Sequence, residues 1–497
     1  MKYKKERRFK PNLCNGAMTF EDCEIAILRN AVDESDKIKG EKNVNNEEVK
    51  KILTIVEHFI RQKKLILYGG TAINNILPNS AKFYNKDIEL PDYDMYSKNA
   101  LEDAKELADI YYKEGYLDVE AKSGVHVGTY KVFVNFMPIA DITDLNSQIY
   151  KEILKDSITV NGMKHSPPDF LRMNMYLELS RPQGDVSRWE KVLKRLSLLN
   201  QHFPLKIESN CKTIDFQRGL DSINICSSKS VTNNRECESI KNLSERLYIV
   251  TRDILINQEV VFFGGYAASL YSRYMPEHEK HQVNKIPDFD VLSDEPEKCA
   301  EIVKEQLLDS GFKKIKLVNH PAIGETIPEH VEIIVSNETI AFIYKPIACH
   351  SYNKLHIDGK DIHIATIDTI LTFYLAFIYT GEPEHIRERL LCMAKYLFEI
   401  EEKNRLEQRG LLKRFSLECY GKQQTLEEIR SEKALKYKEL SGKRGTKEYD
   451  MWFLKYIPGA KVNGAKVKKM KTEKIRSSKN KTRRTDNKKT EDNGYFF

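Results

Sequence analysis

The chain contains the stretch Leu65-Ile-Leu-Tyr-Gly-Gly-Thr71 and, one loop later, Pro91-Asp-Tyr-Asp-Met95. The first stretch predicts a short buried strand that runs into a tight turn, because glycine adopts backbone angles that are closed to other residues. The second predicts a strand whose two carboxylates occupy alternate positions, and alternate residues of a strand point to the same face. Two carboxylates held a few ångströms apart are suited to bind a divalent cation against a phosphorylated ligand.

Each half of this pattern also has an ordinary explanation. A Gly-Gly pair is common in tight turns, and paired aspartates are common on protein surfaces. The functional interpretation takes the backbone amides of Gly69 and Gly70, with the start of a helix predicted over 71–77, as a phosphate-binding corner. Tyr68 would precede this corner, and the Thr71 hydroxyl would add a hydrogen-bond donor.

The same pattern occurs a second time in the chain. Phe263-Gly-Gly-Tyr266 repeats the glycine turn, and Asp288-Phe-Asp290 lies 196 residues after Asp92-Tyr-Asp94. Gly311 follows Gly115 by the same 196 residues, and each glycine is expected to close a helix. The helices predicted just before the two copies cover 47–63 and 240–256. Several landmarks at a nearly fixed offset predict an internal duplication.

A third carboxylate on a neighbouring strand would add oxygen ligands to such a metal site. One or two strands are predicted over 125–142, and the available acids are Asp141 and Asp144. We prefer Asp141, because it follows the apolar Pro138-Ile-Ala140 and would lie where a strand leaves the core. In the second copy, counting from His330, the matching place is Tyr344-Lys-Pro346, which supplies no acid. The second copy is therefore expected to be a retained fold that serves as a scaffold or RNA platform.

Composition limits the class of protein. The 497 residues are enough for two or three domains, and 41% apolar and 31% charged residues indicate a globular protein. No apolar run reaches the roughly 18 residues that suggest a membrane span. The nine cysteines contain no Cys-x-x-Cys pair, so we expect neither a zinc site nor a disulfide framework, and a reducing compartment.

The positive charge is concentrated at the C-terminal end. Residues 461–492 contain 13 Lys/Arg and 4 Asp/Glu, a net charge of +9. The whole chain has a net charge of +7, so the rest of it carries −2 and is close to neutral. Such a polar segment cannot bury enough surface to offset its ordering entropy, so we expect a disordered tail. Two interpretations stay open. The tail either binds a phosphate backbone through its positive charge, or it keeps the protein soluble or localises it.

These motifs carry a family resemblance. The order of strand, Gly-Gly, helix and Asp-x-Asp strand is that of the polymerase β-like nucleotidyltransferase superfamily. The stretches 65–73, 91–97 and 139–142 resemble the poly(A) polymerase catalytic subunits of large cytoplasmic DNA viruses, most closely the mimivirus and asfarvirus types and more distantly the poxvirus type. The similarity covers roughly residues 50–380. Asn135 is a departure, because an asfarvirus-type relative carries an aspartate there.

The resemblance implies an α/β (α+β) fold with two tandem polymerase β-like nucleotidyltransferase domains, helical additions and the basic tail. Five regions are expected. They are an N-terminal extension over 1–45, a catalytic domain with a helical segment over 46–205, a polar linker over 206–238, a second, inactive domain with C-terminal helices over 239–458, and the tail over 459–497.

The resemblance also implies template-independent transfer of AMP from ATP to the 3′ end of RNA, with Mg²⁺ or Mn²⁺ held by Asp92, Asp94 and Asp141. It further implies a homodimer and a place in the cytoplasmic viral factory, with packaging into the virion as an option. The expected nucleotide contacts are Tyr68, Gly69, Gly70, Thr71, Arg172 and Lys191. For Arg172 and Lys191 the ordinary alternative is a solvated helix charge.

Two other functions stay open on the sequence alone. The first is another terminal nucleotidyltransferase, of the uridylyl- or CCA-adding type, because no base-selecting residue is visible. The second is a non-catalytic RNA-binding subunit with two decayed folds. The three intact carboxylates Asp92, Asp94 and Asp141 argue against the second alternative.

Overall fold

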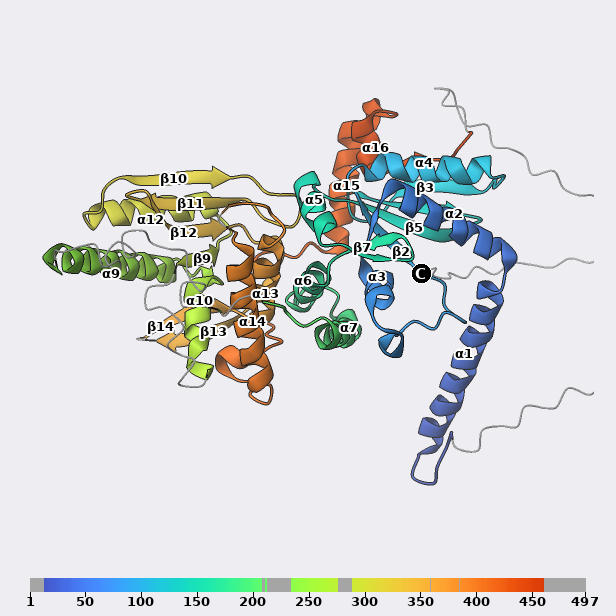
Figure 1. Cartoon of the computed structure of the whole chain (residues 1–497), viewed down its shortest axis with the longest axis horizontal. Coiled ribbons are helices and arrows are strands. Elements are labelled where there is room, and N and C mark those ends of the chain that lie inside the picture. Colours follow the sequence, from blue (N-terminus) through green and yellow to red (C-terminus); the bar gives the residue numbers. More distant parts are fainter. Residues whose placement is uncertain are drawn as a thin grey trace, which may run out of the picture. The chain divides into compact units, whose positions relative to one another are not determined.

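The computed structural model describes residues 13–207, 211, 234–275, 288–357, 359–383 and 385–459. The basic tail and most of the predicted linker lie outside these residues. The described helices and strands form two mixed sheets, each with its own helices (Figure 1), and this confirms the expected α/β fold class. No helix within the described ranges is both long enough and apolar enough to cross a membrane.

The first sheet has the strand order β16-β3-β4-β5-β2-β1-β7-β6. Strands β2 and β5 pair in parallel, as do β1 and β7, and the other neighbours are antiparallel. The strands are β1 (Ile66–Leu67), β2 (Tyr93–Ser97), β3 (Val119–Ser123), β4 (Thr129–Val134), β5 (Met137–Asp144), β6 (Ile158–Val160), β7 (Met163–His165) and β16 (Lys455–Tyr456).

Helix α2 shows why the sequence folds locally as it does. It covers Glu47–Lys63 as predicted, begins at Asn46, whose side chain accepts from the Glu48 amide, and ends at Lys64 in the left-handed conformation. Its apolar positions recur at helical spacing, and all of them face the core. The other helices of this part are α3 (Gly69–Ile76), α4 (Ala100–Lys113), α5 (Ser147–Lys155), α6 (Pro168–Leu179) and α7 (Trp189–His202).

The second sheet repeats the first. Its order is β10-β11-β12-β9-β8-β14-β13-β15, so seven strands correspond to β3-β4-β5-β2-β1-β7-β6 with the same parallel and antiparallel pairings. This correspondence confirms the predicted duplication. The strands are β8 (Val261–Phe262), β9 (Phe289–Leu292), β10 (Ile315–His320), β11 (His330–Val335), β12 (Glu338–Tyr344), β13 (His350–Ile357), β14 (Lys360–Ala365) and β15 (Cys419–Tyr420).

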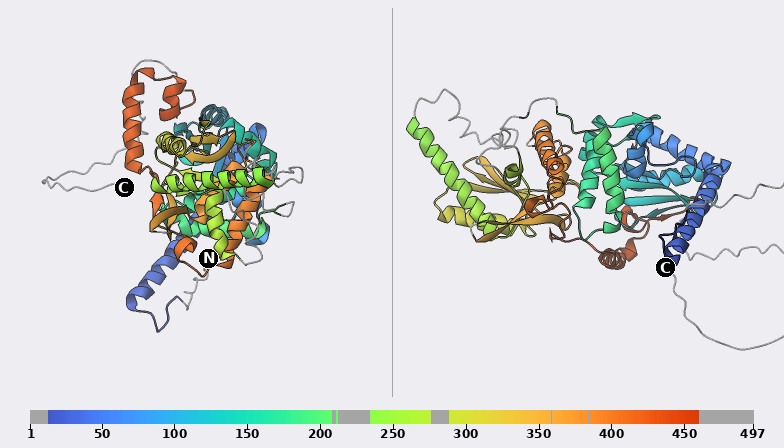
Figure 2. Two further views of the ribbon diagram at one scale, coloured as in Figure 1. Left: turned by 90° about the vertical axis from the view of Figure 1, so that its left-hand side faces the viewer. Right: turned by 90° about the horizontal axis from the view of Figure 1, so that it is seen from below.

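The helices repeat as well. The second set is α9 (Asn234–Asn257), α10 (Gly265–Tyr271), α12 (Pro296–Asp309), α13 (Ile367–Phe377) and α14 (Arg387–Lys403). Helices α6 and α13 occupy equivalent places after β7 and β14, and they pack against each other. Figures 1 and 2 show these two helices, with α7 and α14, between the two sheets.

The chain then returns to the first sheet. Helices α15 (Leu426–Leu440) and α16 (Lys447–Phe453) lead into β16, which pairs with β3. Lys105 Nζ lies 2.9 Å from Asp450 Oδ2, and Tyr456 Oη donates to Asp109 Oδ1 at 2.7 Å. The last part of the expected second region, 239–458, therefore lies against the first sheet.

The expected N-terminal extension is largely a helix. Helix α1 covers Phe20–Val44 and begins with a capping box between Thr19 and Asp22. None of its side chains is buried. Short 3₁₀ turns complete the described structure: η1 (Asn79–Ala81), η2 (Val186–Arg188), η4 (Ser272–Tyr274), η5 (Gly410–Leu412) and η6 (Ser441–Lys443).

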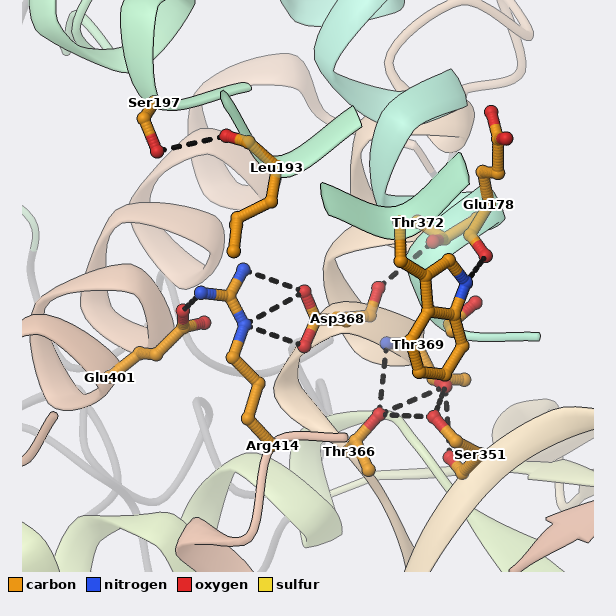
Figure 3. Close-up of polar contacts among 12 residues, drawn as sticks. Glu178, Leu193, Ser197, Ser351, Thr366, Asp368, Thr369, Thr372, Glu401 and Arg414 are labelled. Carbon is orange, nitrogen blue, oxygen red and sulfur yellow. Dashed lines mark hydrogen bonds and ion pairs between the residues drawn. The ribbon is translucent and has the colours of Figure 1, made fainter. Parts of the chain in front are cut away.

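A buried ion-pair cluster ties the second set of helices to the segment after it (Figure 3). Arg414 Nη2 lies 2.9 Å from Asp368 Oδ1, and Arg414 Nη1 lies 2.5 Å from Glu401 Oε1. Asp368 is 1% exposed. The cluster joins α13, α14 and the loop that follows η5, so it fixes three segments that are distant in sequence.

The prediction that the cysteines form no disulfide framework is wrong. Disulfides join Cys14 to Cys23, Cys211 to Cys392 and Cys349 to Cys419, with Cα–Cα distances of 5.2, 5.8 and 5.1 Å. The second and third pairs are separated by 181 and 70 residues in the sequence, so their spacing could not indicate them. The expected reducing compartment, which rested on the absence of a disulfide framework, loses its support.

Candidate active site

The glycine turn packs directly on the aspartate strand. Gly69 has φ +70°, and a Cβ atom there would lie 2.6 Å from Asp94 Oδ2. A Cβ atom on Gly70 would lie 2.3 Å from Tyr84 Oη. Helix α3 begins at Gly69 itself rather than at Thr71, so the two glycines form its first turn. A side chain at either position would displace a group of the site.

The three predicted carboxylates come together on two parallel strands. Asp94 on β2 lies opposite Asp141 on β5, and neighbouring strands are about 4.8 Å apart. Asp92 precedes β2 and is exposed. Asp144 is also exposed and lies at the far end of β5, opposite Ser97. Asn135 lies in the turn between β4 and β5, outside this group, with φ +49°.

The surroundings of Asp92 and Asp94 raise the pKa of both carboxyl groups. Burial raises the pKa of Asp94 to about 7, and the charges of Asp92 and Asp141 add to the effect. Partial desolvation by the surrounding protein also raises the pKa of Asp92, although its surface stays exposed, and the charge of Asp141 contributes. Lys131 on β4 opposes both shifts, and its Nζ hydrogen-bonds to Asp141. Lys191 and Arg195 also lower the pKa of Asp92, and Arg188 lowers that of Asp94, but the pKa of both acids stays raised.

The donor set suits a divalent cation, but the arrangement differs from a formed metal site. Carboxylate oxygens are the ligands that Mg²⁺ prefers, and mutual repulsion among three carboxylates favours a cation between them. In the described part of the chain, however, no group of three His, Cys, Asp or Glu side chains is placed to hold a metal ion. Asp141 is turned to Lys131 instead. The predicted metal ligands are adjacent, and their role as ligands stays a prediction.

A phosphate-binding corner is built beside these acids. Thr71 is 4% exposed, and its Oγ1 has no hydrogen-bond partner among the described residues. Arg195 on α7 lies over Gly70, because a Cβ atom there would be 3.0 Å from each of its Nη atoms. Arg195 Nη2 donates to Tyr84 Oη at 2.9 Å, and its guanidinium lies 5.0 Å from the centre of the Phe83 ring. A guanidinium held over a helix N-terminus is suited to bind phosphate.

The two basic residues predicted as nucleotide contacts differ. Lys191 on α7 is exposed, and its charge lowers the pKa of Asp92, so it lies beside the site. Arg172 is 1% exposed, and its nitrogens donate to Asn200, Asp169 and the Phe203 carbonyl. These contacts favour the alternative for Arg172, a structural role, over the predicted nucleotide contact. Each of its three nitrogens donates to a partner on α6 or at the end of α7.

The second copy has lost the third carboxylate, at a position just before the predicted stretch Tyr344-Lys-Pro346. Asp290 on β9 lies opposite Phe342 on β12, so Phe342, not Tyr344, stands where the first copy has Asp141. The place of Lys131 is taken by Glu332, which lies opposite Phe342. An acid and a phenyl ring thus replace the Lys131–Asp141 pair of the first copy.

One of the two remaining acids of the second copy, Asp288, pairs with a helix residue. Asp288 Oδ2 accepts from Arg389 Nη2 at 3.0 Å, with side-chain exposures of 6% and 11%. Arg389 is the third residue of α14, as Lys191 is the third residue of α7. Aromatic rings fill the neighbourhood, and the cavity beside Asp290 measures about 20 Å³, room for about one water molecule.

The comparisons with known proteins concern the segment that holds these residues. Residues 54–185 match the family model of the poly(A) polymerase catalytic subunit. A relative in African swine fever virus (isolate Pig/Kenya/KEN-50/1950), named "Putative poly(A) polymerase catalytic subunit", is 35% identical over 176 residues, 34% of this chain and 37% of that protein. A relative of the same name in Acanthamoeba polyphaga mimivirus is 30% identical over 179 residues, 35% of this chain and 29% of that protein.

The match spans about a third of the length of these viral relatives. Over the whole fold, the chain is similar to the crystal structure of the Megavirus polyadenylate synthase, with a TM-score of 0.69 and 19% identity over 88% of this chain and 86% of that one. At that identity the similarity concerns the fold, and it includes both sheets.

Three residues of the site were not predicted. Lys131, Tyr84 and Arg195 contact the carboxylates or the glycine turn. A partial signal existed for Arg195, because it follows Lys191 by four residues and therefore lies on the same face of the helix. Lys131 had no signal beyond its place in a strand, and the loop that carries Tyr84 had none.

Proposed function

We propose that this chain is a poly(A) polymerase that transfers AMP from ATP to the 3′ hydroxyl of RNA without a template. The observation that carries the proposal is the pairing of Asp94 with Asp141 on two parallel strands, with Asp92 just before the first of them, beside the Gly69-Gly70 corner. This group lies inside the segment that matches the poly(A) polymerase catalytic subunit family. The second copy contributes a scaffold.

The residues of the site bind either the triphosphate or the cation. The first-turn amides of α3, the Thr71 hydroxyl and the Arg195 guanidinium bind the triphosphate, and Lys191 adds positive charge near Asp92. Asp92, Asp94 and Asp141 would hold Mg²⁺ or Mn²⁺, which supplies Lewis-acid activation of the RNA hydroxyl and offsets charge on the leaving pyrophosphate. Lys131 would release Asp141 as the cation takes over its role. No protein nucleophile is required, because positioning and electrostatics suffice.

The test is extension of a labelled RNA by the wild-type protein with each ribonucleoside triphosphate supplied alone. ATP-dependent growth of the RNA is the expected result. Growth with UTP, or with CTP and ATP in sequence, would move the assignment to a uridylyl- or CCA-adding enzyme. RNA binding without growth would favour the scaffold alternative. The homodimer and the place in the viral factory stay predictions, and native mass measurement tests the first.

Metal binding should depend on pH. The pKa of Asp94 is raised to about 7, so below that pH the site must release a proton to hold a cation. We therefore expect the affinity for Mn²⁺ to rise about tenfold per pH unit up to about pH 7 and to level off above it. Titration followed by electron paramagnetic resonance measures this directly. An affinity that does not change between pH 5 and pH 7 would contradict the role of Asp94.

Arg195 should govern ATP affinity. Loss of a hydrogen bond to a charged group costs about 1.5–3 kcal/mol, so Arg195→Gln should raise the KM for ATP by about ten- to a hundredfold. Steady-state extension at varied ATP measures the effect. Lys194→Gln on the same helix is the matched control, because Lys194 is 73% exposed and pairs with Glu190. Equal KM values in the two variants would remove Arg195 from the triphosphate site.

A further inference from the structure

A cavity begins beside the carboxylates, on the side away from Arg195. Tyr96 and Thr143 lie two residues beyond Asp94 and Asp141 on their strands, so all four point to the same face of the sheet. Tyr96 and Thr143 line a cavity of about 510 Å³. Arg195 lies near the Asp92 end of β2, whereas this cavity lies near the Ser97 end. The space suits a second reactant rather than the triphosphate.

The walls of this cavity come from both copies of the fold. Helix α6 supplies Phe170 and Asn174, helix α13 supplies Thr372 and Phe373, and the loop after β10 supplies Glu325. Its volume is within the range of sites that hold small ligands or nucleotides. The junction of the two copies thus creates a space that neither sheet forms alone.

A second cavity continues from the first towards the C-terminal helices. It measures about 520 Å³ and is lined by residues of α15 and α16, among them Lys433 and Trp452. The residues that line both cavities are His126, Val127, Arg181, Glu325 and Ile347. The two spaces therefore meet around Arg181.

Arg181 is a cation that no carboxylate of the described residues contacts directly. Its Nε is buried and unpaired, and its side chain makes no hydrogen bond or ion pair within the described ranges. Burial lowers the pKa of Arg181 to about 10, although the charges of Glu178 and Glu325 oppose the shift. The neighbouring His350 is fully buried, which lowers its pKa to about 3 and keeps it neutral. A desolvated guanidinium between two cavities is suited to accept a phosphate oxygen.

The second cavity also offers a surface for a nucleobase. Trp452 lines it, and Lys436 Nζ lies 5.9 Å from the centre of the Trp452 ring. Lys433 lines the same cavity and donates to the Gly124 carbonyl at 2.7 Å. An aromatic ring beside basic side chains is the usual arrangement for binding single-stranded nucleic acid.

We propose that the single-stranded RNA acceptor lies through these two joined cavities, with one phosphate on Arg181 and a base on Trp452. Its 3′ end would then reach Asp94 and Asp141 from the Tyr96–Thr143 side, opposite the triphosphate. The proposal rests on the proposed function for the identity of the reaction, and the binding itself can be measured separately.

The test uses the full chain and a short fluorescein-labelled oligoadenylate, with binding followed by anisotropy in the absence of ATP. Arg181→Gln and Trp452→Leu should each weaken RNA binding about tenfold. Arg181→Gln should also reduce the slope of log affinity against log salt by about 0.7, as expected for one lost contact to a single strand. The KM for ATP should not change. Arg430→Gln on α15 is the control, because Arg430 is exposed and lines neither cavity.

Three results separate the alternatives. Unchanged RNA affinity in both variants overturns the proposal, and unchanged RNA affinity with a raised KM for ATP would assign the cavity to the nucleotide. If Arg181→Gln does not fold, Trp452→Leu decides. A wild-type protein that binds the RNA through these residues but does not extend it would remove the proposed function and leave the RNA path in place.

Discussion

Asp94→Asn should abolish extension of RNA, with a fall in kcat of about 10³-fold or more. Asp94 lies opposite Asp141 on the neighbouring strand and contacts the glycine turn, so it is central to the group of acids. The change removes a charge and keeps the size of the side chain. Single-turnover extension at saturating ATP and RNA measures the effect.

The control is Asp87→Asn, since Asp87 is exposed in the loop that leads to β2. It makes the same chemical change outside the group of acids and should leave kcat within about twofold. Unfolding curves for both variants separate a loss of chemistry from a loss of folded protein. Asp94→Asn with more than a tenth of the wild-type kcat would contradict the assignment.

The largest loss of stability is expected for Arg414→Gln. Arg414 pairs with Asp368, which is 1% exposed, and also with Glu401 (Figure 3). Removing the shared cation leaves two buried carboxylates uncompensated, and breaking a buried ion pair in this way costs about 3–5 kcal/mol. We expect this decrease in the free energy of unfolding, measured by urea denaturation.

The matched control is Arg409→Gln. Glu407 pairs with Arg409 at 2.9 Å, but the two side chains are 47% and 85% exposed. An exposed pair contributes at most about 1 kcal/mol, because water screens it. Similar losses in the two variants would show that the Arg414 cluster does not stabilise the fold beyond a surface pair.

Long periodic elements and repeated motifs could be predicted from the sequence. The apolar stripe of α2 and the recurrence of Gly-Gly and Asp-x-Asp identified the helix and the duplication correctly. The hairpins β6–β7 and β13–β14 were missed. The first has strands of three residues each, too short for an alternating pattern to appear. The return of β16 to the first sheet depends on contacts across some 330 residues, which no local pattern shows.

The site was predicted in part. Alternation within a strand placed Asp92 and Asp94, and the apolar residues before Asp141 indicated its strand. Counting from His330 gave residue 345 and so misplaced the second-copy equivalent, Phe342, by three residues. His330 is the first residue of β11, whereas His126 lies in the turn before β4, so the two histidines are not equivalent positions.

The basic residues show the limit of sequence reasoning. Arg172 and Arg195 both follow helical patterns, and only the packed structure separates the buried cation from the one over Gly70. The cysteine pairs were missed for the same reason, because partners that are distant in sequence meet only in the fold.

The central claim is that the first copy carries the only working site of the two. Its most direct test is ATP-dependent RNA extension by Asp94→Asn and by Asp290→Asn, the equivalent change in the second copy, under identical conditions and with folding checked for each. Asp94→Asn is expected to lose extension, and Asp290→Asn is expected to keep it. Loss of extension in a folded Asp290→Asn protein, or its survival in Asp94→Asn, would contradict the account.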